Sequence, residues 1–182
     1  MIKKNARSVV LNANTVCEQK LCLLCFINLS RIKNWGENVR IIKFEAKYRD
    51  DLIFMILEAK NALGRVPGLN EDLLDIDANY FQKGDMFWIA VDENDRVIGS
   101  VGYSSSEGTD EVVLHRLFVK YNLKHQGIGT ALLITAEEYL KAIGKKSVVV
   151  HLGDKESFFE SWQFYPKHGY AEFKPSYMRK DL

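Results

Sequence analysis

Hydrophobic and polar positions alternate or cluster along residues 39–182 in a way that predicts a domain of mixed strands and helices. Runs typical of strands occupy 39–45, 86–91, 96–103, 111–120, 146–152 and 170–174. Stretches typical of helices occupy 50–63, 70–83, 127–143 and 158–164. The predicted order is β-α-α-β-β-β-α-β-α-β, an α/β (mixed α+β) fold class without internal repeats.

The first 38 residues differ from the rest of the chain in charge. They hold six basic and two acidic residues, whereas residues 39–182 hold 19 basic and 22 acidic residues. The apolar run at 21–29 is too short to cross a bilayer, and no signal-peptide cleavage pattern follows it. We therefore predict a basic, cysteine-containing N-terminal extension of uncertain structure over 1–38 and one domain over 39–182.

Composition narrows the class of protein. Of the 182 residues 47% are hydrophobic, and 25 basic residues nearly balance 24 acidic ones, giving a formal net charge of +1. This balance argues against a dedicated nucleic-acid or membrane-surface binder. Cys17, Cys22 and Cys25 have the spacing of three iron–sulfur ligands, but the chain has no fourth cysteine, so we expect no metal. An odd cysteine count without a secretory signal predicts a cytoplasmic protein.

Two glycines open the predicted helix at 127–143. Unpaired N–H groups at a helix N-terminus favour a phosphate, and Gly127 and Gly129 let the main chain approach one closely. Lys124 and His125 add side-chain donors. The alternative is a plain strand-to-helix turn; Leu132 occupies the position where a dinucleotide-binding fingerprint needs its third glycine.

A second cluster, W-Q-F-Y-P-K-H-G-Y, spans residues 162–170. On periodicity alone its Tyr165 fits a core aromatic residue as well as a catalytic acid.

Taken together, the two clusters resemble a known family. K-H-Q-G-I-G-T-A-L-L at 124–133 is similar to the acyl-CoA motif Q/R-x-x-G-x-G/A of the GCN5-related N-acetyltransferases (GNAT), and F-Y-P-K-H-G-Y at 164–170 is similar to their later motif F/L-Y-x-x-x-G-F/Y. The resemblance implies a central, mixed but mostly antiparallel sheet flanked by helices. It also implies acetyl-CoA as co-substrate, no metal, and acetyl transfer to a primary amine by direct attack.

The resemblance also implies roles for individual residues. Main-chain groups of the strand before the loop would hold the pantetheine arm and the acetyl carbonyl, and Tyr165 would protonate the departing thiolate. The strand positions are Leu117, Phe118 and Val119, and the loop positions are Lys124, His125, Gln126, Gly127, Ile128, Gly129 and Thr130. Two positions depart from the family pattern: Lys124 replaces Gln or Arg, and Phe158 stands where an asparagine is common.

The general base is sought on the strand at 111–120, where members of the family often place a carboxylate. A regular strand would put Glu111, Val113, His115, Leu117 and Val119 on one face, with Arg116 on the other, in an ion pair. Glu111 and His115 are the candidates, and His115 has a suitable ordinary pKa. The alternative for His115 is a hydrogen-bonded structural role. His125 and His168 are interpreted as loop residues.

The acceptor amine is not encoded in a recognisable motif. Acidic residues at 71, 72, 75 and 77 suggest a cationic substrate, and a solvated helix face explains them equally well. We expect a small-molecule amine or a protein or peptide amine as acceptor, and neither nucleic acid nor membrane as partner; a homodimer is left open. Two alternatives remain: an acyl-CoA-binding sensor or degenerate acetyltransferase without turnover, and a nucleic-acid-associated module using residues 1–38.

Overall fold

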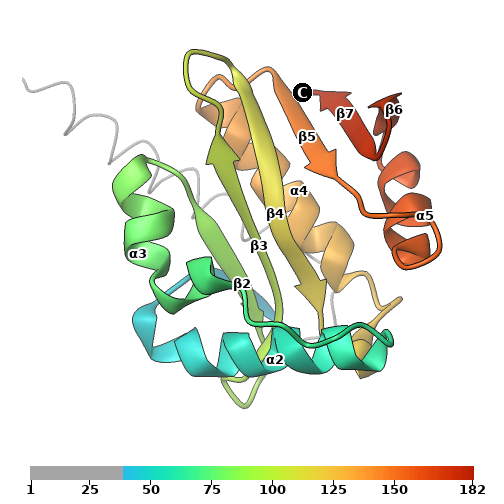
Figure 1. Ribbon diagram of the computed structural model, residues 1–182. Helices are drawn as coiled ribbons and strands as arrows, with labels where there is room; N and C mark the ends of the chain where they lie inside the picture. The colour runs from blue at the N-terminus through green and yellow to red at the C-terminus, as the bar shows by residue number, and fades with distance from the viewer. Residues whose placement is uncertain (1–38) are drawn as a thin grey trace, which may run out of the picture. The chain divides into compact units, whose positions relative to one another are not determined.

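The computed structural model describes residues 39–182, which form a seven-stranded sheet in the order β1-β2-β3-β4-β5-β7-β6 (Figure 1). Only β4 and β5 pair in parallel, and all other neighbours are antiparallel. The predicted class, a mixed and mostly antiparallel sheet with helices, is confirmed. The strands are β1 (Arg40–Lys43), β2 (Phe87–Val91), β3 (Val97–Ser105), β4 (Glu111–Val119), β5 (Ser147–His151), β6 (Ala171–Lys174) and β7 (Tyr177–Asp181).

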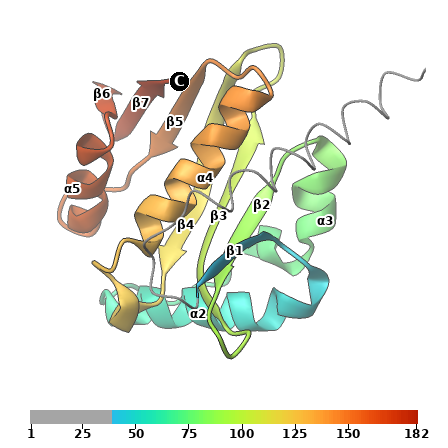
Figure 2. The ribbon, with the colours of Figure 1, turned by 180° about the vertical axis from the view of Figure 1, so that it is seen from behind.

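The helices lie on both faces of this sheet. In Figures 1 and 2, which view the sheet from opposite sides, α2 and α4 cover opposite faces. The α-helices are α2 (Arg49–Ala62), α3 (Ile76–Asn79), α4 (Ile128–Ala142) and α5 (Phe159–Lys167), and single 3-10 turns are η1 (Ala46–Tyr48), η2 (Glu71–Leu74), η3 (Phe81–Lys83) and η4 (Tyr121–Leu123). Within the described range no helix is long and apolar enough to span a membrane.

Two elements differ from the prediction. The expected helix over 70–83 is broken into η2, α3 and η3 because Asp75 and Tyr80 leave the helical conformation, and the Asp75 carboxylate accepts the N–H of Ala78 and so caps α3. The expected last strand at 170–174 is followed by a further strand, β7, which turns back at Ser176 and inserts between β5 and β6. The predicted extension over 1–38, with its three cysteines, lies outside the described residues.

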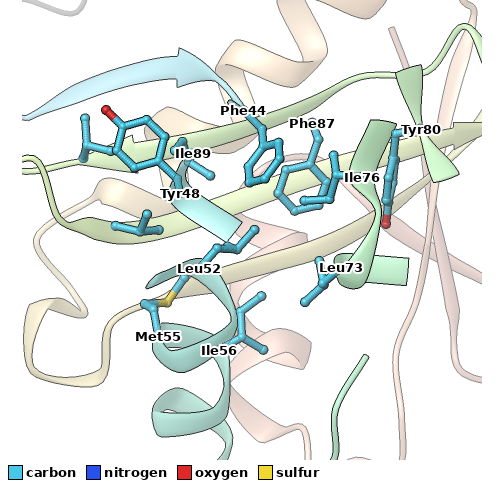
Figure 3. Packing of buried hydrophobic residues seen from close by; sticks show 12 residues of the cluster. Phe44, Tyr48, Leu52, Met55, Ile56, Leu73, Ile76, Tyr80, Phe87 and Ile89 are labelled. Carbon is cyan, nitrogen blue, oxygen red and sulfur yellow. The ribbon is translucent and has the colours of Figure 1, made fainter. Parts of the chain in front are cut away.

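A cluster of buried side chains fixes α2 to one face of the sheet (Figure 3). The Phe87 ring on β2 is its centre and packs edge-on against Tyr80 at 5.1 Å and Phe44 at 6.0 Å between ring centroids. Burying aromatic and aliphatic groups of this size is the main stabilising contribution to such a layer. The cluster comprises Phe44, Tyr48, Leu52, Met55, Ile56, Leu73, Ile76, Tyr80, Phe87, Ile89, Val91 and Val97.

On the opposite face α4 lies directly on β3. Gly99 permits this approach, since a Cβ at that position would come within 2.8 Å of the Leu132 side chain and 3.2 Å of the Ile128 side chain. The apolar stripe of α4, including Leu132, Leu133 and Leu140, is fully buried.

The strand β4 loses its partner β5 partway along. The two strands pair only over Glu111–Leu114 and Ser147–Val150. Along its other edge β5 pairs with β7, from Ser147 to His151, and beyond Leu114 the strand β4 continues to Val119 beside β3 alone. Figure 1 shows β4 and β5 diverging beyond the paired part. The main chain of residues 115–119 therefore has a strand neighbour on one side only.

A β-bulge interrupts β4 at the start of this segment. Gly102 of β3 lies opposite His115 and Ser100 lies opposite Phe118, so that two residues of β4 oppose Val101. Arg116 in the bulge has a φ of 53°, which is unusual for a residue other than glycine. The alternation expected for a regular strand is therefore wrong. His115 and Phe118 lie on the face of the α2 core, opposite Gly102 and Ser100, whereas a Val119 methyl group lies 3.5 Å from the Cβ position of Gly129 on α4.

Candidate active site

The loop between β4 and α4 ends in a helix N-terminus with free main-chain donors. Gly127 precedes the helix with a left-handed φ of 82°, and the first helical bond is from Ala131 N–H to the Gly127 carbonyl, at 3.0 Å. No side chain caps this end, and the N–H groups of residues 128–130 have no hydrogen-bond partner within the described chain. Such a helix end favours an anion, and a phosphate above all.

The side chains of the loop divide into buried and exposed ones. The side chain of Ile128, the first residue of α4, is buried against the sheet, so this residue offers only its N–H group. His125 and Gln126 are exposed. A Cβ on Gly129 would meet only Val119 and Phe164, at the ordinary contact distances of 3.5 and 3.6 Å. The protein itself would therefore tolerate a methyl group at position 129.

Lys124, the first position of the loop motif, is directed toward α5. Its ammonium forms an ion pair with Glu160 and lies 5.1 Å from the centre of the Tyr121 ring. The positive charge of Lys124 is thereby partly neutralised, and the side chain ties the loop to α5.

Tyr165 on α5 combines a buried ring with an unpartnered hydroxyl. Its side chain packs edge-on against Phe164 and Tyr170, at 5.3 and 5.2 Å between centroids, and the residue is 7% exposed. Among the described residues its hydroxyl makes no hydrogen bond, and burial is the only influence that shifts its pKa. Burial raises the pKa of Tyr165, so the phenol keeps its proton at neutral pH and can act as a donor.

His168 links the two motifs by contacts to Thr130 and Phe164. The interpretation of His168 as a loop residue did not include this role. Its Nδ1 lies 2.9 Å from the Phe164 carbonyl and its Nε2 lies 3.0 Å from the Thr130 Oγ1. A carbonyl can only accept, so Nδ1 carries the hydrogen and the Nε2 of a neutral ring accepts from the Thr130 hydroxyl. No sequence pattern indicates this contact, because 38 residues separate the partners.

His115 lies at the β4 bulge on the face of the sheet that α2 covers. Its Nε2 is 2.6 Å from the Ser104 Oγ on β3. Burial lowers the pKa of His115, and the charge of the neighbouring Arg116 lowers it further. The ring is therefore mostly neutral near pH 7, the form in which it can accept a proton.

Arg116 forms an ion pair, as expected, but not on the face opposite His115. Its guanidinium holds the Asp72 carboxylate of η2 with two hydrogen bonds, of 3.0 Å from Nε and 2.6 Å from Nη2. Asp72 also accepts from the Tyr80 hydroxyl, and the Tyr80 ring approaches within 3.0 Å of the Cβ position of Gly102, which is the residue opposite His115. The bulge places Arg116 and His115 on the same side of the sheet.

Glu111 is far from these groups along β4. It pairs with Ser147 at the start of the strand, eight residues before Val119, and its carboxylate lies 3.4 Å from the Ser147 Oγ and 3.8 Å from the Arg179 Nε. The structure thus brings His115 to the bulge and leaves Glu111 at the opposite end of the strand.

A clamp from the α2–η2 loop reaches the segment before α5. Arg65 donates to the Ser157 carbonyl from Nε at 3.1 Å and from Nη2 at 2.8 Å, and its guanidinium lies 3.8 Å from the centre of the Phe158 ring. Phe158 rests on Gly153, where any Cβ would come within 2.0 Å of the ring. The residue that replaces the family's common asparagine therefore serves as a platform for Arg65.

The acidic residues at 71–77 mostly have partners of their own. Asp72 binds Arg116, Asp75 caps Ala78, and Asp77 accepts from Gln82. These bonds favour a structural role over recognition of a cationic substrate.

Residues 39–182 offer no metal site, and a surface hollow among them does not coincide with the predicted site. That range contains no group of three or more side chains suited to a metal ion. A surface hollow of about 900 Å³ lies between the β1–η1 segment and η2–α3, and it contains none of the residues predicted for the acetyl-transfer site.

Comparison with known proteins agrees with this geometry. The family model described as acetyltransferase (GNAT) family matches residues 53–170. No curated protein shows significant similarity to the chain.

Many solved structures share the fold. A GNAT-family acetyltransferase from Staphylococcus aureus Mu50 is 23% identical, with a TM-score of 0.71, and the match covers 79% of this chain and 99% of that one. An acetyltransferase from Streptococcus agalactiae 2603 is 18% identical, with a TM-score of 0.72 and coverage of 80% and 99%. The PaiA N-acetyltransferase of Thermoplasma acidophilum, solved in complex with coenzyme A, is 21% identical, with a TM-score of 0.63 and coverage of 79% and 99%.

Proposed function

Because the chain belongs to the acetyltransferase (GNAT) family, whose members use acetyl-CoA, we propose that it transfers an acetyl group from acetyl-CoA to a primary amine by direct attack. One observation carries the proposal. The unpartnered Tyr165 hydroxyl lies on the same helix as Phe164, whose ring contacts the Cβ position of Gly129 beside the free N–H groups of α4. This contact supports the proposal that the helix end binds the phosphate and Tyr165 donates the proton within one site.

The residues present fit coenzyme A. The N–H groups of residues 128–130 would hold its pyrophosphate, since they are unpaired and sit at the positive end of the α4 dipole. Main-chain groups of Leu117, Phe118 and Val119 would hold the pantetheine arm and the acetyl carbonyl, because β4 lacks a β5 partner there. The bound thioester supplies an activated acyl group.

Two side chains would move protons. His115 is mostly neutral near pH 7 and would accept a proton from the attacking amine, directly or through water, while its Nε2 contacts Ser104. Tyr165 would donate its phenolic proton to the departing sulfur, since burial raises the pKa of Tyr165 and the phenol is protonated at neutral pH. Glu111 is assigned no part in either transfer.

The function is tested with purified protein, acetyl-CoA and a panel of primary amines that includes polyamines, amino sugars, amino acids and peptides. Free thiol is measured as coenzyme A is released, and binding of coenzyme A alone is measured by calorimetry. We expect amine-dependent thiol release with at least one class of amine, together with binding. Binding without release for any amine would favour the acyl-CoA sensor, and absence of binding at millimolar coenzyme A would contradict both.

Coenzyme A should also raise the thermal midpoint of unfolding, since a ligand that binds only the native state stabilises it by mass action. At a concentration 100 times the dissociation constant the gain is about 2.7 kcal/mol. ATP, which carries phosphates but no pantetheine arm, is the control and is expected to shift the midpoint less.

A further inference from the structure

The β4 bulge is held in place from outside the strand. Arg116 keeps a left-handed φ of 53°, which costs energy for any residue but glycine, asparagine or aspartate. Two contacts stabilise this conformation: the Arg116 carbonyl accepts from the Ser100 Oγ at 2.7 Å, and the guanidinium binds Asp72 through both Nε and Nη2. A two-pronged bond of this kind fixes direction as well as distance.

Asp72 is itself well fixed. It belongs to η2, whose Leu73 is buried in the α2 core, and its carboxylate also accepts from the Tyr80 hydroxyl at 2.5 Å. Burial acts to raise the pKa of Asp72, but the hydrogen bonds from Arg116 and Tyr80 outweigh it, and the pKa lies below its ordinary value. Asp72 is therefore ionised at neutral pH and balances the charge of Arg116.

The bulge is also where the chemistry of the proposed function converges. His115 precedes Arg116, and Leu117, whose main chain is assigned to the thioester, follows it. We propose that Asp72 is a positioning residue for acetyl transfer, which through Arg116 holds the His115 ring and the Leu117 main chain in the arrangement that the reaction needs. This inference rests on the proposed function.

The charges around His115 make its pKa a measure of the role of Asp72 that does not depend on catalysis. Arg116 lowers the pKa of His115, while Asp72 and Asp85 act to raise it. Replacing Asp72 by asparagine keeps the shape of the side chain and removes its negative charge, leaving Arg116 without its balancing carboxylate. The pKa of His115 should then fall below its value in the natural protein.

The test compares Asp72→Asn with the natural protein in two measurements. The first is an NMR titration of the histidine rings in ligand-free protein, in which we expect His115 to titrate at lower pH in the variant. The second is steady-state kinetics with acetyl-CoA and an accepted amine. We expect kcat to fall about tenfold, the effect of weakening one charged hydrogen bond, with the KM for acetyl-CoA changed less than about threefold. The acid limb of the pH profile should move to lower pH.

The chain offers a matched control in Asp51→Asn. Asp51 on α2 also accepts from both Nε and Nη2 of an arginine, Arg96, and from one further donor, the Val97 N–H. Hydrogen bonds from Arg96 and Val97 outweigh burial and lower the pKa of Asp51. The control should lower the thermal midpoint and leave kcat and the titration of His115 unchanged.

A second pair of variants separates the contacts of Asp72. Arg116→Lys keeps the charge but loses the two-pronged bond, and we expect it to lower kcat by a similar factor. Tyr80→Phe removes only the third hydrogen bond, and we expect nearly natural kinetics.

Unchanged kcat in folded Asp72→Asn or Arg116→Lys, or an unmoved His115 titration in Asp72→Asn, would overturn the proposal. Absence of amine acetylation by the natural protein would overturn the proposed function, and the ligand-free titration would still decide whether Asp72 controls His115.

Discussion

The N-terminus of α4 and the bulge of β4 differ in which polar groups they present and in how the chain supplies them. At α4 the groups are main-chain N–H donors, and three consecutive residues, 128–130, supply them. At the bulge the groups are side chains from distant parts of the chain: Asp72 from η2, Ser104 from β3, and His115 and Arg116 from β4.

This difference separates generic from particular recognition. Main-chain donors at a helix end recognise a phosphate whatever the neighbouring side chains are, so a site of this kind suits a ligand shared by a whole family. A network of side chains can change one residue at a time, so a site of the kind found at the bulge suits recognition that differs from one family member to the next. The largest predicted effect concerns Tyr165, whose neighbour Phe164 contacts the Cβ position of Gly129 on α4.

Tyr165→Phe should lower kcat by roughly two to four orders of magnitude, the usual contribution of general acid catalysis. The ring stays buried, so the affinity for coenzyme A should change only a few-fold. The measurement is kcat and coenzyme A affinity on the same preparation. If Tyr165 serves only in packing, the variant should keep both its turnover and its stability, because the hydroxyl makes no hydrogen bond that the change could remove.

Gly129 tests the main-chain side of the comparison. Gly129→Glu places a carboxylate next to the free N–H groups and should weaken coenzyme A binding roughly a hundredfold, as expected for losing a strong charged hydrogen bond. Gly129→Ala is the matched control for folding, because a Cβ there meets Val119 and Phe164 only at ordinary distances. The affinity of both variants for coenzyme A is measured by calorimetry. Natural affinity in a folded Gly129→Glu protein would mean that the pyrophosphate does not bind at the N-terminus of α4.

The fold was largely predictable where the pattern of the sequence is local and repeated. The alternating strands and the apolar stripe of α4 follow directly from periodicity. The helix prediction for 70–83 was wrong because Asp75 and Tyr80 leave the helical conformation in a stretch whose hydrophobic spacing resembles a helix. The strand β7 was missed because its place between β5 and β6 depends on long-range pairing.

The candidate site divides in the same way. The free donors at α4 could be expected, since Gly127 and Gly129 let the main chain approach a phosphate and the two motifs together resemble those of the family. The bulge could not, because it depends on Arg116 binding Asp72, 44 residues earlier in the sequence. The expectation of a regular strand placed Arg116 on the wrong face for this reason.

Arg65 provides the test with the smallest expected effect, which concerns the α2–η2 loop and the segment before α5. Its guanidinium joins the α2–η2 loop to the segment before α5 through the Ser157 carbonyl and the Phe158 ring. One charged hydrogen bond with a cation–π contact is worth on the order of 1.5–3 kcal/mol when it is partly shielded from water. Arg65→Ala should therefore let the segment before α5 move and raise the KM for acetyl-CoA about tenfold.

Because Arg65 touches neither His115 nor Tyr165, kcat should stay within about threefold of its natural value. Arg65→Lys keeps the charge but loses the planar fork and should have an intermediate KM. Arg40→Ala, which removes an ion pair with Asp95 that is exposed on both sides, is the control and should leave the kinetics unchanged. A lowered thermal midpoint with an unchanged KM for acetyl-CoA in Arg65→Ala would mean that the clamp stabilises the α2–η2 loop and the segment before α5 without contributing to acetyl-CoA binding.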